Sequence, residues 1–145
     1  MMNETPNTDR VSEARALAME IHHGQTDKGN NPYIYHVLDV VSRVAHLGPD
    51  YEIVGFLHDA VEDAPDHRPL TFAEIEQRFG PIVCAGVDAM TKQKTEDYHT
   101  DYLPRVASDP IGKVVKVADA SHNISKAHLI TDEALQKQLR AKYTE

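Results

Sequence analysis

The chain has 145 residues, of which 41% are hydrophobic and 26% are charged, and its formal net charge is −8. This length and composition suit one globular domain with a core of its own. The negative charge argues against a nucleic-acid polymer as the partner, because such binding needs a basic face. A small phosphorylated substrate remains compatible, because a bound divalent cation reverses the sign of the local field.

The single cysteine, Cys84, excludes an intrachain disulfide and favours a reducing compartment. No apolar run approaches the ~18 residues that a membrane-spanning helix needs. Residues 1–10 lack the basic and apolar segments of a signal peptide. We therefore expect a cytoplasmic protein without a membrane partner, with residues 1–8 as a flexible lead-in and residues 9–145 as a single domain.

Apolar residues recur at helical spacing along most of the chain. Helices are predicted from Asp9 to the loop at Gly24, from Tyr33 to Leu47, from Tyr51 to Asp63, from Thr71 to Phe79, from Pro81 to Met90, from Tyr98 to Ser108, from Pro110 onward, and from Thr131 to near the C-terminus. The segment Ile53–Leu57 is apolar nearly all round, which predicts a central helix. The predicted fold class is therefore all-α, a helical bundle.

Three local signals refine this prediction. Thr71 and Glu74 form a capping box that opens a helix. Pro104 is expected to kink or break the helix in which it lies. The valine-rich residues 114–117 also suit a strand, but no partner strand is evident, so a helix is predicted there.

Four histidine or carboxylate side chains fall at helix starts or inside apolar helices: His36, His58, Asp59 and Asp119. Burying a carboxylate without a partner costs several kcal/mol. One divalent ion with mixed nitrogen and oxygen ligands would satisfy all four groups. Each residue taken singly also suits an ordinary core or capping role, so spacing alone leaves both interpretations open.

Two further carboxylates stand one helical turn beyond two of these residues. Glu62 follows His58 by four residues, and Asp63 follows Asp59 by four, so each pair shares a face of the predicted helix. Such carboxylates can act as base, acid or water-orienting groups. Asn123 lies one turn after the last of the four residues and is placed to hold a substrate oxygen or a water.

Several motifs, in order along nearly the whole chain, resemble the hydrolase domain of the RelA/SpoT family, within the HD superfamily of metal-dependent phosphohydrolases. They are His23-Gly24-Gln25, Asp27-Lys28, Pro32-Tyr33-Ile34 with His36, Leu57 through Asp63, Phe79-Gly80, Met90-Thr91-Lys92, and Val115 through Asp119 with His122-Asn123. The resemblance covers roughly residues 12–143. It implies an HD-domain helical bundle in the stand-alone, hydrolase-only form.

The resemblance also implies the roles of individual residues. A divalent cation, commonly manganese, would be held by His36, His58, Asp59 and Asp119. The implied catalytic pair is Glu62 and Asp63. Substrate contacts would come from Lys28, Asn123, Tyr102 and Lys126. The implied reaction removes pyrophosphate from the 3′ position of guanosine-3′,5′-bis(diphosphate), ppGpp, so the expected partner is a small-molecule nucleotide.

Two alternatives remain open. Asp27 stands where these hydrolases typically carry a basic residue that seats the nucleotide, which favours an HD hydrolase of another nucleotide or small phosphoester. A nucleotide-binding regulator without turnover belongs to another class, but it has no need of the Glu62–Asp63 pair. Among the remaining histidines, His23 is expected to support the shape of the loop 24–32, and His122 to lie beside the site.

Overall fold

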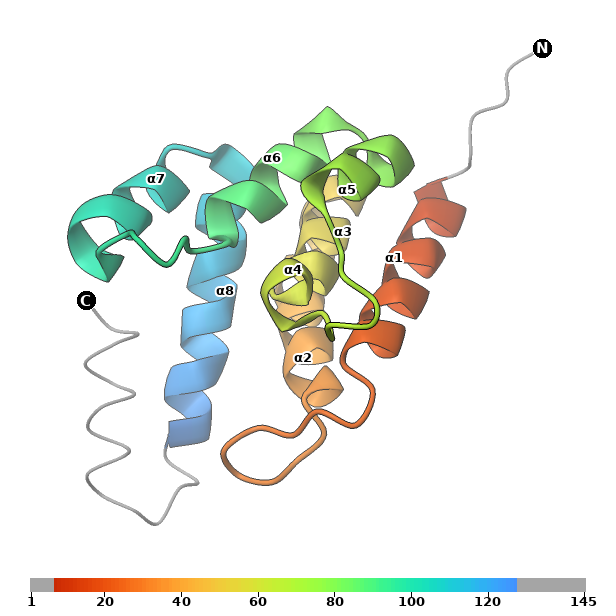
Figure 1. Cartoon of the computed structure of the whole chain (residues 1–145), viewed down its shortest axis with the longest axis horizontal. Helices are drawn as coiled ribbons and strands as arrows, with labels where there is room; N and C mark the ends of the chain where they lie inside the picture. The colour runs from red at the N-terminus through yellow and green to blue at the C-terminus, as the bar shows by residue number, and fades with distance from the viewer. Residues whose placement is uncertain (1–6, 128–145) are drawn as a thin grey trace.

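The computed structural model of the chain describes residues 7–127. These residues form α1 (Asn7–Ile21), α2 (Ile34–Val44), η1 (Ala45–Leu47), α3 (Pro49–Leu57), α4 (Ala60–Asp63), α5 (Phe72–Phe79), α6 (Pro81–Met90), η2 (Tyr98–Tyr102), α7 (Leu103–Ala107) and α8 (Pro110–Ala127) (Figure 1). Within this part of the chain there is no strand, only an isolated bridge between Thr26 and Pro32. The prediction of an all-α bundle is confirmed.

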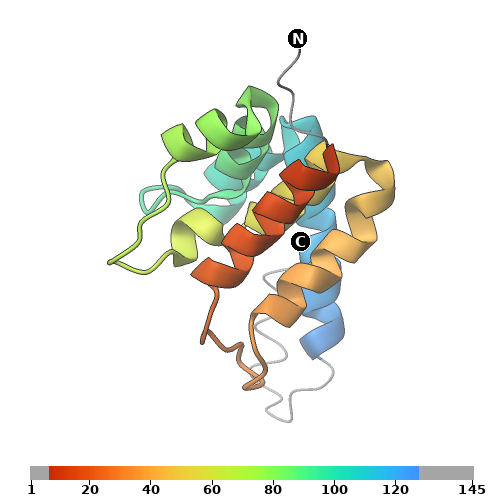
Figure 2. The ribbon, with the colours of Figure 1, turned by 90° about the vertical axis from the view of Figure 1, so that its right-hand side faces the viewer.

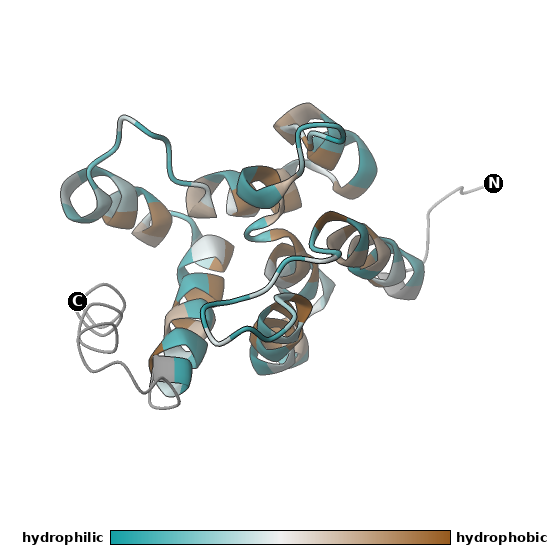
Figure 3. Ribbon diagram, turned by 60° about the horizontal axis from the view of Figure 1, so that its bottom comes forward, coloured by the Kyte–Doolittle hydropathy of each residue, from teal (hydrophilic) through white to brown (hydrophobic). Residues whose placement is uncertain are grey.

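Helix α3 lies at the centre of the bundle, as its composition predicted. Its residues Ile53 to Leu57 are all buried, and the helix contacts α1, α2, α6 and α8. Figure 1 shows α3 between α1 and α8, and Figure 2 shows α1 and α2 in front of it. The hydrophobic residues fall mainly in the helices, and the connecting loops are largely hydrophilic (Figure 3). The core therefore packs α3 against α1, α2, α6 and α8.

The predicted continuous helix from Tyr51 to Asp63 is wrong, because the backbone leaves helical geometry at Asp59. Helix α3 ends at Leu57, Asp59 takes φ −111° and ψ 2°, and α4 begins at Ala60. The His58 ring donates from Nδ1 to the Gly55 carbonyl at 2.7 Å. That carbonyl is the acceptor that the Asp59 N–H would use in an uninterrupted α-helix.

Other boundaries follow local chemistry. The Thr71 hydroxyl accepts from the Glu74 N–H at 3.1 Å, which confirms the predicted cap of α5. The segment around Pro104 is broken as predicted: a π-helical turn, η2, ends at Tyr102, and Pro104 falls in the first turn of α7, where its missing N–H costs no bond. Residues 114–117 are helical within α8.

The ends of the chain bear on two further predictions. Helix α1 begins at Asn7, two residues before the predicted start. The rest of the predicted lead-in and the helix predicted from Thr131 lie outside the described residues. Across residues 7–127, no helix combines the length and hydropathy that a membrane crossing requires.

Candidate metal centre

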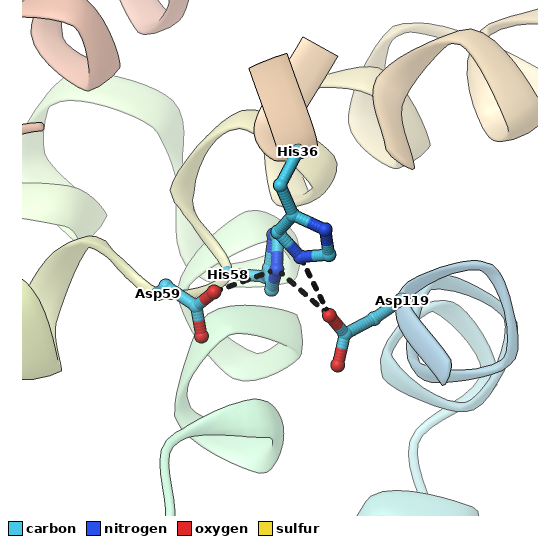
Figure 4. Close-up of side chains that lie close together, drawn as sticks. All are labelled: His36, His58, Asp59 and Asp119. Atoms are coloured by element: carbon cyan, nitrogen blue, oxygen red, sulfur yellow. Dashed lines mark hydrogen bonds and ion pairs between the residues drawn. The ribbon is translucent and has the colours of Figure 1, made fainter. Parts of the chain in front are cut away.

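Four side chains from three separate parts of the chain converge where α2, the α3–α4 turn and α8 meet (Figure 4). They are the four predicted metal ligands: His36, His58, Asp59 and Asp119. Each offers one ligand atom, and these atoms all lie within 4.8 Å of one another. His36, His58 and Asp119 are buried, and Asp59 is half-buried. The structure thus gathers the predicted set into a candidate metal site.

The atoms that face one another in this cluster are nitrogens and carboxylate oxygens. His36 Nε2 lies 2.8 Å from Asp119 Oδ1. His58 Nε2 lies 3.0 Å from Asp59 Oδ2 and 3.5 Å from Asp119 Oδ1, yet this buried atom makes no well-formed hydrogen bond with any described residue. Because the Gly55 carbonyl can only accept, the proton of a neutral His58 is on Nδ1. The Nε2 lone pair then faces two carboxylates, which is favourable only with a proton or a cation between them.

The charges of the cluster show how strongly it attracts a positive group. Burial opposes the charged form of His58, but Asp59 and Asp119 outweigh burial and hold the pKa of His58 well above its ordinary value. Burial likewise opposes ionisation of Asp119, but the hydrogen bond with His36 and the charge of His58 hold the pKa of Asp119 well below its usual range. A divalent cation would replace the His58 proton here, since metal binding releases protons from its ligands. The mixed nitrogen and oxygen donors fit such an ion.

Two aromatic side chains contact the cluster from outside. The Tyr33 hydroxyl donates to Asp59 Oδ2. Burial and the charge of Asp59 raise the pKa of Tyr33, so it stays a neutral donor. His122 Nδ1 lies 2.7 Å from His36 Nδ1, with the two rings inclined by only 21°. The sequence predicted His122 beside the site; the structure shows that it contacts a predicted ligand directly.

The cluster opens into a cavity of about 540 Å³ between the α1–α2 loop and α8. Its wall includes all six predicted catalytic and substrate-binding residues: Lys28, Glu62, Asp63, Tyr102, Asn123 and Lys126. Lining residues that the sequence did not single out as substrate contacts include Gln25, Lys92 and Tyr98, and Lys116 also lines the cavity. These residues come from distant segments, and no local motif groups them.

The two predicted catalytic carboxylates lie side by side in this wall. The Asp63 N–H donates to the Asp59 carbonyl at 2.9 Å, so the predicted one-turn spacing survives the break before α4. Glu62 is exposed to the cavity, whereas Asp63 is half-buried. Burial raises the pKa of Asp63, and the charge of Asp59 raises it further. A hydrogen bond from Gln25 acts in the opposite direction but does not cancel this effect. A raised pKa suits a group that exchanges protons near neutral pH.

Lysines and tyrosines form much of the opposite wall. Lys116 Nζ lies 3.4 Å from Asp119 Oδ2 and 5.3 Å from the centre of the Tyr102 ring. Tyr102 is buried, and its hydroxyl donates to the Met90 carbonyl at 2.6 Å. Burial raises the pKa of Tyr102 to about 12, against the charge of Lys116. Tyr102 therefore presents its ring to the cavity, because its hydroxyl is hydrogen-bonded to the Met90 carbonyl.

The loop before α2 is shaped by Asp27. Its Oδ1 accepts from the N–H groups of Gly29 and Asn31, both at 2.9 Å, and its Oδ2 lies 3.4 Å from Lys126 Nζ. Asn30 takes a left-handed φ of 65°, which asparagine tolerates. The acidic residue thus has a structural role and also neutralises a predicted phosphate-binding lysine.

The prediction for His23 is wrong. His23 is exposed, and the buried neighbour His22 contacts the loop instead, with its Nδ1 2.7 Å from Gln25 Oε1. The two histidines stand just beyond the end of α1, where helical periodicity no longer tells which side chain faces inward.

A family model described as "HD domain" matches residues 14–142, and the chain belongs to this family. Among its relatives is a guanosine-3′,5′-bis(diphosphate) 3′-pyrophosphohydrolase from Aquifex aeolicus (strain VF5), 31% identical over 90% of this chain and 20% of the relative. Another is the bifunctional (p)ppGpp synthase/hydrolase SpoT of Escherichia coli (strain K12), 30% identical over 79% of this chain and 18% of the relative. The chain thus spans about a fifth of the length of these relatives.

The fold has a solved counterpart. A structure described as a metazoan ortholog of SpoT that hydrolyzes ppGpp matches with a TM-score of 0.77, covering 99% of this chain and 85% of that chain. The two sequences are 22% identical, so this likeness establishes the fold. It confirms the predicted HD-domain bundle.

Proposed function

We propose that this chain is a metal-dependent phosphohydrolase that acts on a nucleotide, formed by a single HD domain over residues 9–145. The observation that carries the proposal is a buried cluster of two histidines and two aspartates that opens into a cavity lined by carboxylates and lysines. The proposed metal ligands are His36, His58, Asp59 and Asp119. Manganese is the proposed ion, because the cluster offers mixed imidazole and carboxylate donors and the RelA/SpoT resemblance points to it.

The residues around the cavity have separate proposed roles in hydrolysis. A cation held by the four proposed ligands would lower the pKa of a bound water and polarise a phosphoryl oxygen. Glu62 and Asp63 orient the attacking water and take up its proton. The neutral Tyr33 hydroxyl keeps Asp59 in place. Lys28, Lys126 and Asn123 meet the phosphate oxygens, and the rings of Tyr98 and Tyr102 offer a face for the base.

The proposed substrate is ppGpp, from which the enzyme releases the 3′-pyrophosphate. One relative that aligns with most of this chain is named for that activity, and a second is named as a (p)ppGpp synthase/hydrolase. The cavity adds support, because four lysines line it: Lys28, Lys92, Lys116 and Lys126. A substrate with two separate diphosphate groups matches this spread of positive charge near a metal site.

Asp27 favours a second candidate, an HD hydrolase of another nucleotide or small phosphoester. Its carboxylate lines the cavity and lies 3.4 Å from Lys126 Nζ. Negative charge at this position repels a phosphate that a basic residue would attract. A nucleotide-binding regulator without turnover is the candidate of another class, and the same experiment distinguishes all three.

The experiment is a hydrolysis panel with Mn²⁺ that compares ppGpp with nucleoside mono-, di- and triphosphates. We expect pyrophosphate release from ppGpp, with turnover lost in Asp59→Asn and Asp119→Asn. Asp66→Asn, a change of the same kind at an exposed site outside the cavity, should leave turnover intact. Full turnover in Asp59→Asn would refute the metal site. Tight binding without turnover of any nucleotide would establish the regulator.

A further inference from the structure

A chain of hydrogen bonds runs from the buried His22 to the predicted catalytic carboxylate Asp63. His22 Nδ1 lies 2.7 Å from Gln25 Oε1, and Gln25 Nε2 donates to Asp63 Oδ2 at 3.0 Å. His22 is 2% exposed and Gln25 is half-buried. The chain thus begins in the core beyond α1 and ends in the cavity wall.

The donors and acceptors of His22, Gln25 and Asp63 allow these hydrogen bonds to run in only one direction. The amide oxygen of Gln25 can only accept, so His22 carries its proton on Nδ1. His22 Nε2 is buried and makes no hydrogen bond with any described residue, so Nδ1 is the ring nitrogen that bonds to a neighbouring side chain. A reversed Gln25 amide would set its oxygen against the Asp63 carboxylate. His22 therefore holds Gln25 with its NH₂ group toward Asp63.

The same histidine also supports the metal cluster. Its ring lies against the Tyr33 ring, with centroids 5.0 Å apart, and the Tyr33 hydroxyl donates to Asp59. Asp63 Oδ1 makes no hydrogen bond to any described residue, while Asp63 lines the cavity. One carboxylate oxygen is thus fixed by Gln25, and the other is left to a water or substrate.

We propose that Gln25 is a positioning residue for the reaction, which holds the Asp63 carboxylate in its working orientation and is itself oriented by His22. This inference rests on the proposed function, in which Asp63 handles the attacking water. The groups that face Asp63 are Gln25 and His22 on one side and the Asp59–His58 turn on the other. Of these groups, only Gln25 donates a hydrogen bond to the Asp63 carboxylate within residues 7–127.

Kinetics of two variants test the link from Gln25 to Asp63. Gln25→Met keeps the length of the side chain and removes both hydrogen bonds. Gln25→Glu keeps an acceptor for His22 but replaces the donor to Asp63. Because misplaced catalytic groups lower rates by up to ~100-fold, we expect kcat for pyrophosphate release to fall by roughly 10- to 100-fold in both. KM and Mn²⁺ affinity should stay within about threefold of wild type, since neither bond involves a proposed ligand.

A second pair of variants tests the link from His22 to Gln25. His22→Asn places an amide N–H near the position of Nδ1 and should retain most of kcat, whereas His22→Leu should lose as much as Gln25→Met. His23→Asn, at the exposed neighbour, serves as the matched control. Unchanged kcat in Gln25→Met, or a loss confined to KM, would overturn the proposal.

Nitrogen-15 chemical shifts of the histidine rings give a readout independent of turnover. In the wild type we expect a proton on Nδ1 of His22, because this atom faces the Gln25 amide oxygen, and we expect this preference to disappear in Gln25→Met. A proton on Nε2 in the wild type would overturn the proposed chain. If no nucleotide is hydrolysed, the proposed function fails, whereas the His22 tautomer still decides whether the chain exists.

Discussion

The two ring nitrogens of His36 have different partners. Nε2 faces Asp119 at 2.8 Å within the proposed metal site, and Nδ1 faces His122 at 2.7 Å. A histidine that binds a metal through one nitrogen usually donates from the other, and that outer bond sets the tautomer and the ring orientation. His122 also lies with its Nε2 3.7 Å from Asp39 Oδ2, so it is itself oriented from α2.

Replacing His122 should therefore weaken metal binding without removing a ligand. We expect His122→Leu to lower Mn²⁺ affinity by roughly 10- to 100-fold, the usual effect of losing such an outer partner. His122→Asn, whose amide oxygen can accept near the position of Nδ1, should lose less. Isothermal titration calorimetry measures both, with the exposed His46→Leu as control. Wild-type affinity in His122→Leu would show that the His36 tautomer needs no support.

The residues that the sequence predicted best are those with recognisable chemistry in a motif. His58 and Asp59 are adjacent in the chain, and their apolar flanks already pointed to a buried role. The contact between His36 and His122 spans 86 positions, and it exists only because α2 packs on α8. The sequence could place His122 near the site, but it could not predict this bond.

At the scale of the element, the interruption between α3 and α4 matters most for the site. Successive side chains on a continuous α-helix point about 100° apart. The turn at His58 and Asp59 brings both of these neighbours into one cluster. The apolar pattern continues on either side of the turn, which is why periodicity predicted an unbroken helix. The hydrogen bond from the His58 ring to the Gly55 carbonyl cannot be predicted from that pattern.

The contact of α3 with α6 depends on a glycine. A Cβ at Gly86 would lie 2.9 Å from Val54 Cγ2, and Val54 is fully buried. Because overpacking of a filled core is costly, we expect Gly86→Ala to lower the free energy of unfolding by about 1–3 kcal/mol. Urea denaturation measures this. Ala85→Ser, on the exposed side of the same helix, should change stability by less than about 0.5 kcal/mol.

Helix α5 is tied to the loop before it by Glu74. Hydrogen bonds from Arg68, supported by Arg78 and opposed by burial, lower the pKa of Glu74 to about 2. A carboxyl with a depressed pKa stabilises the fold above its ordinary pKa, and this contribution is lost as the pH falls. The window for Glu74 therefore runs from about pH 4.5 down to about pH 2.

Acid titration of stability should reveal this contribution. We expect Glu74→Gln to be less stable than wild type at neutral pH and the difference to shrink as the pH falls through that window. Urea midpoints measured between pH 7 and pH 2.5 give the comparison. Glu76→Gln, at an exposed position of the same helix, provides the control. A gap between Glu74→Gln and wild type that stays constant with pH would contradict the prediction.

For the whole molecule, the proposed ion would join segments that are far apart in the chain. His36 and Asp119 are 83 positions apart, and the α3–α4 turn lies between them in sequence. A ligand that binds only the folded state stabilises it by about 2.7 kcal/mol at a concentration 100 times Kd. We therefore expect Mn²⁺ to raise the unfolding midpoint and EDTA to reverse the gain. Asp119→Asn should remove most of this response; an equal gain in that variant would place the ion elsewhere.

The all-α class was predictable because almost every segment carries a helical period and no stretch competes strongly as a strand. The cavity was not, since its wall combines the loop before α2 with η2 and α8. Those surfaces meet through long-range packing around α3. Residues such as Gln25 and Tyr98 acquire a place in the site only through that packing.

The ion pair between Asp27 and Lys126 places a carboxylate in the cavity that would compete with a substrate phosphate for this lysine. These residues are 99 positions apart and meet across the cavity wall. If Lys126 binds phosphate as proposed, the phosphate would replace Asp27 as the anionic partner of the lysine. Asp27 would form the ion pair with Lys126 again when the cleaved phosphate group dissociates. The residue that departs from the expected basic pattern would therefore weaken ground-state binding and hasten the departure of product.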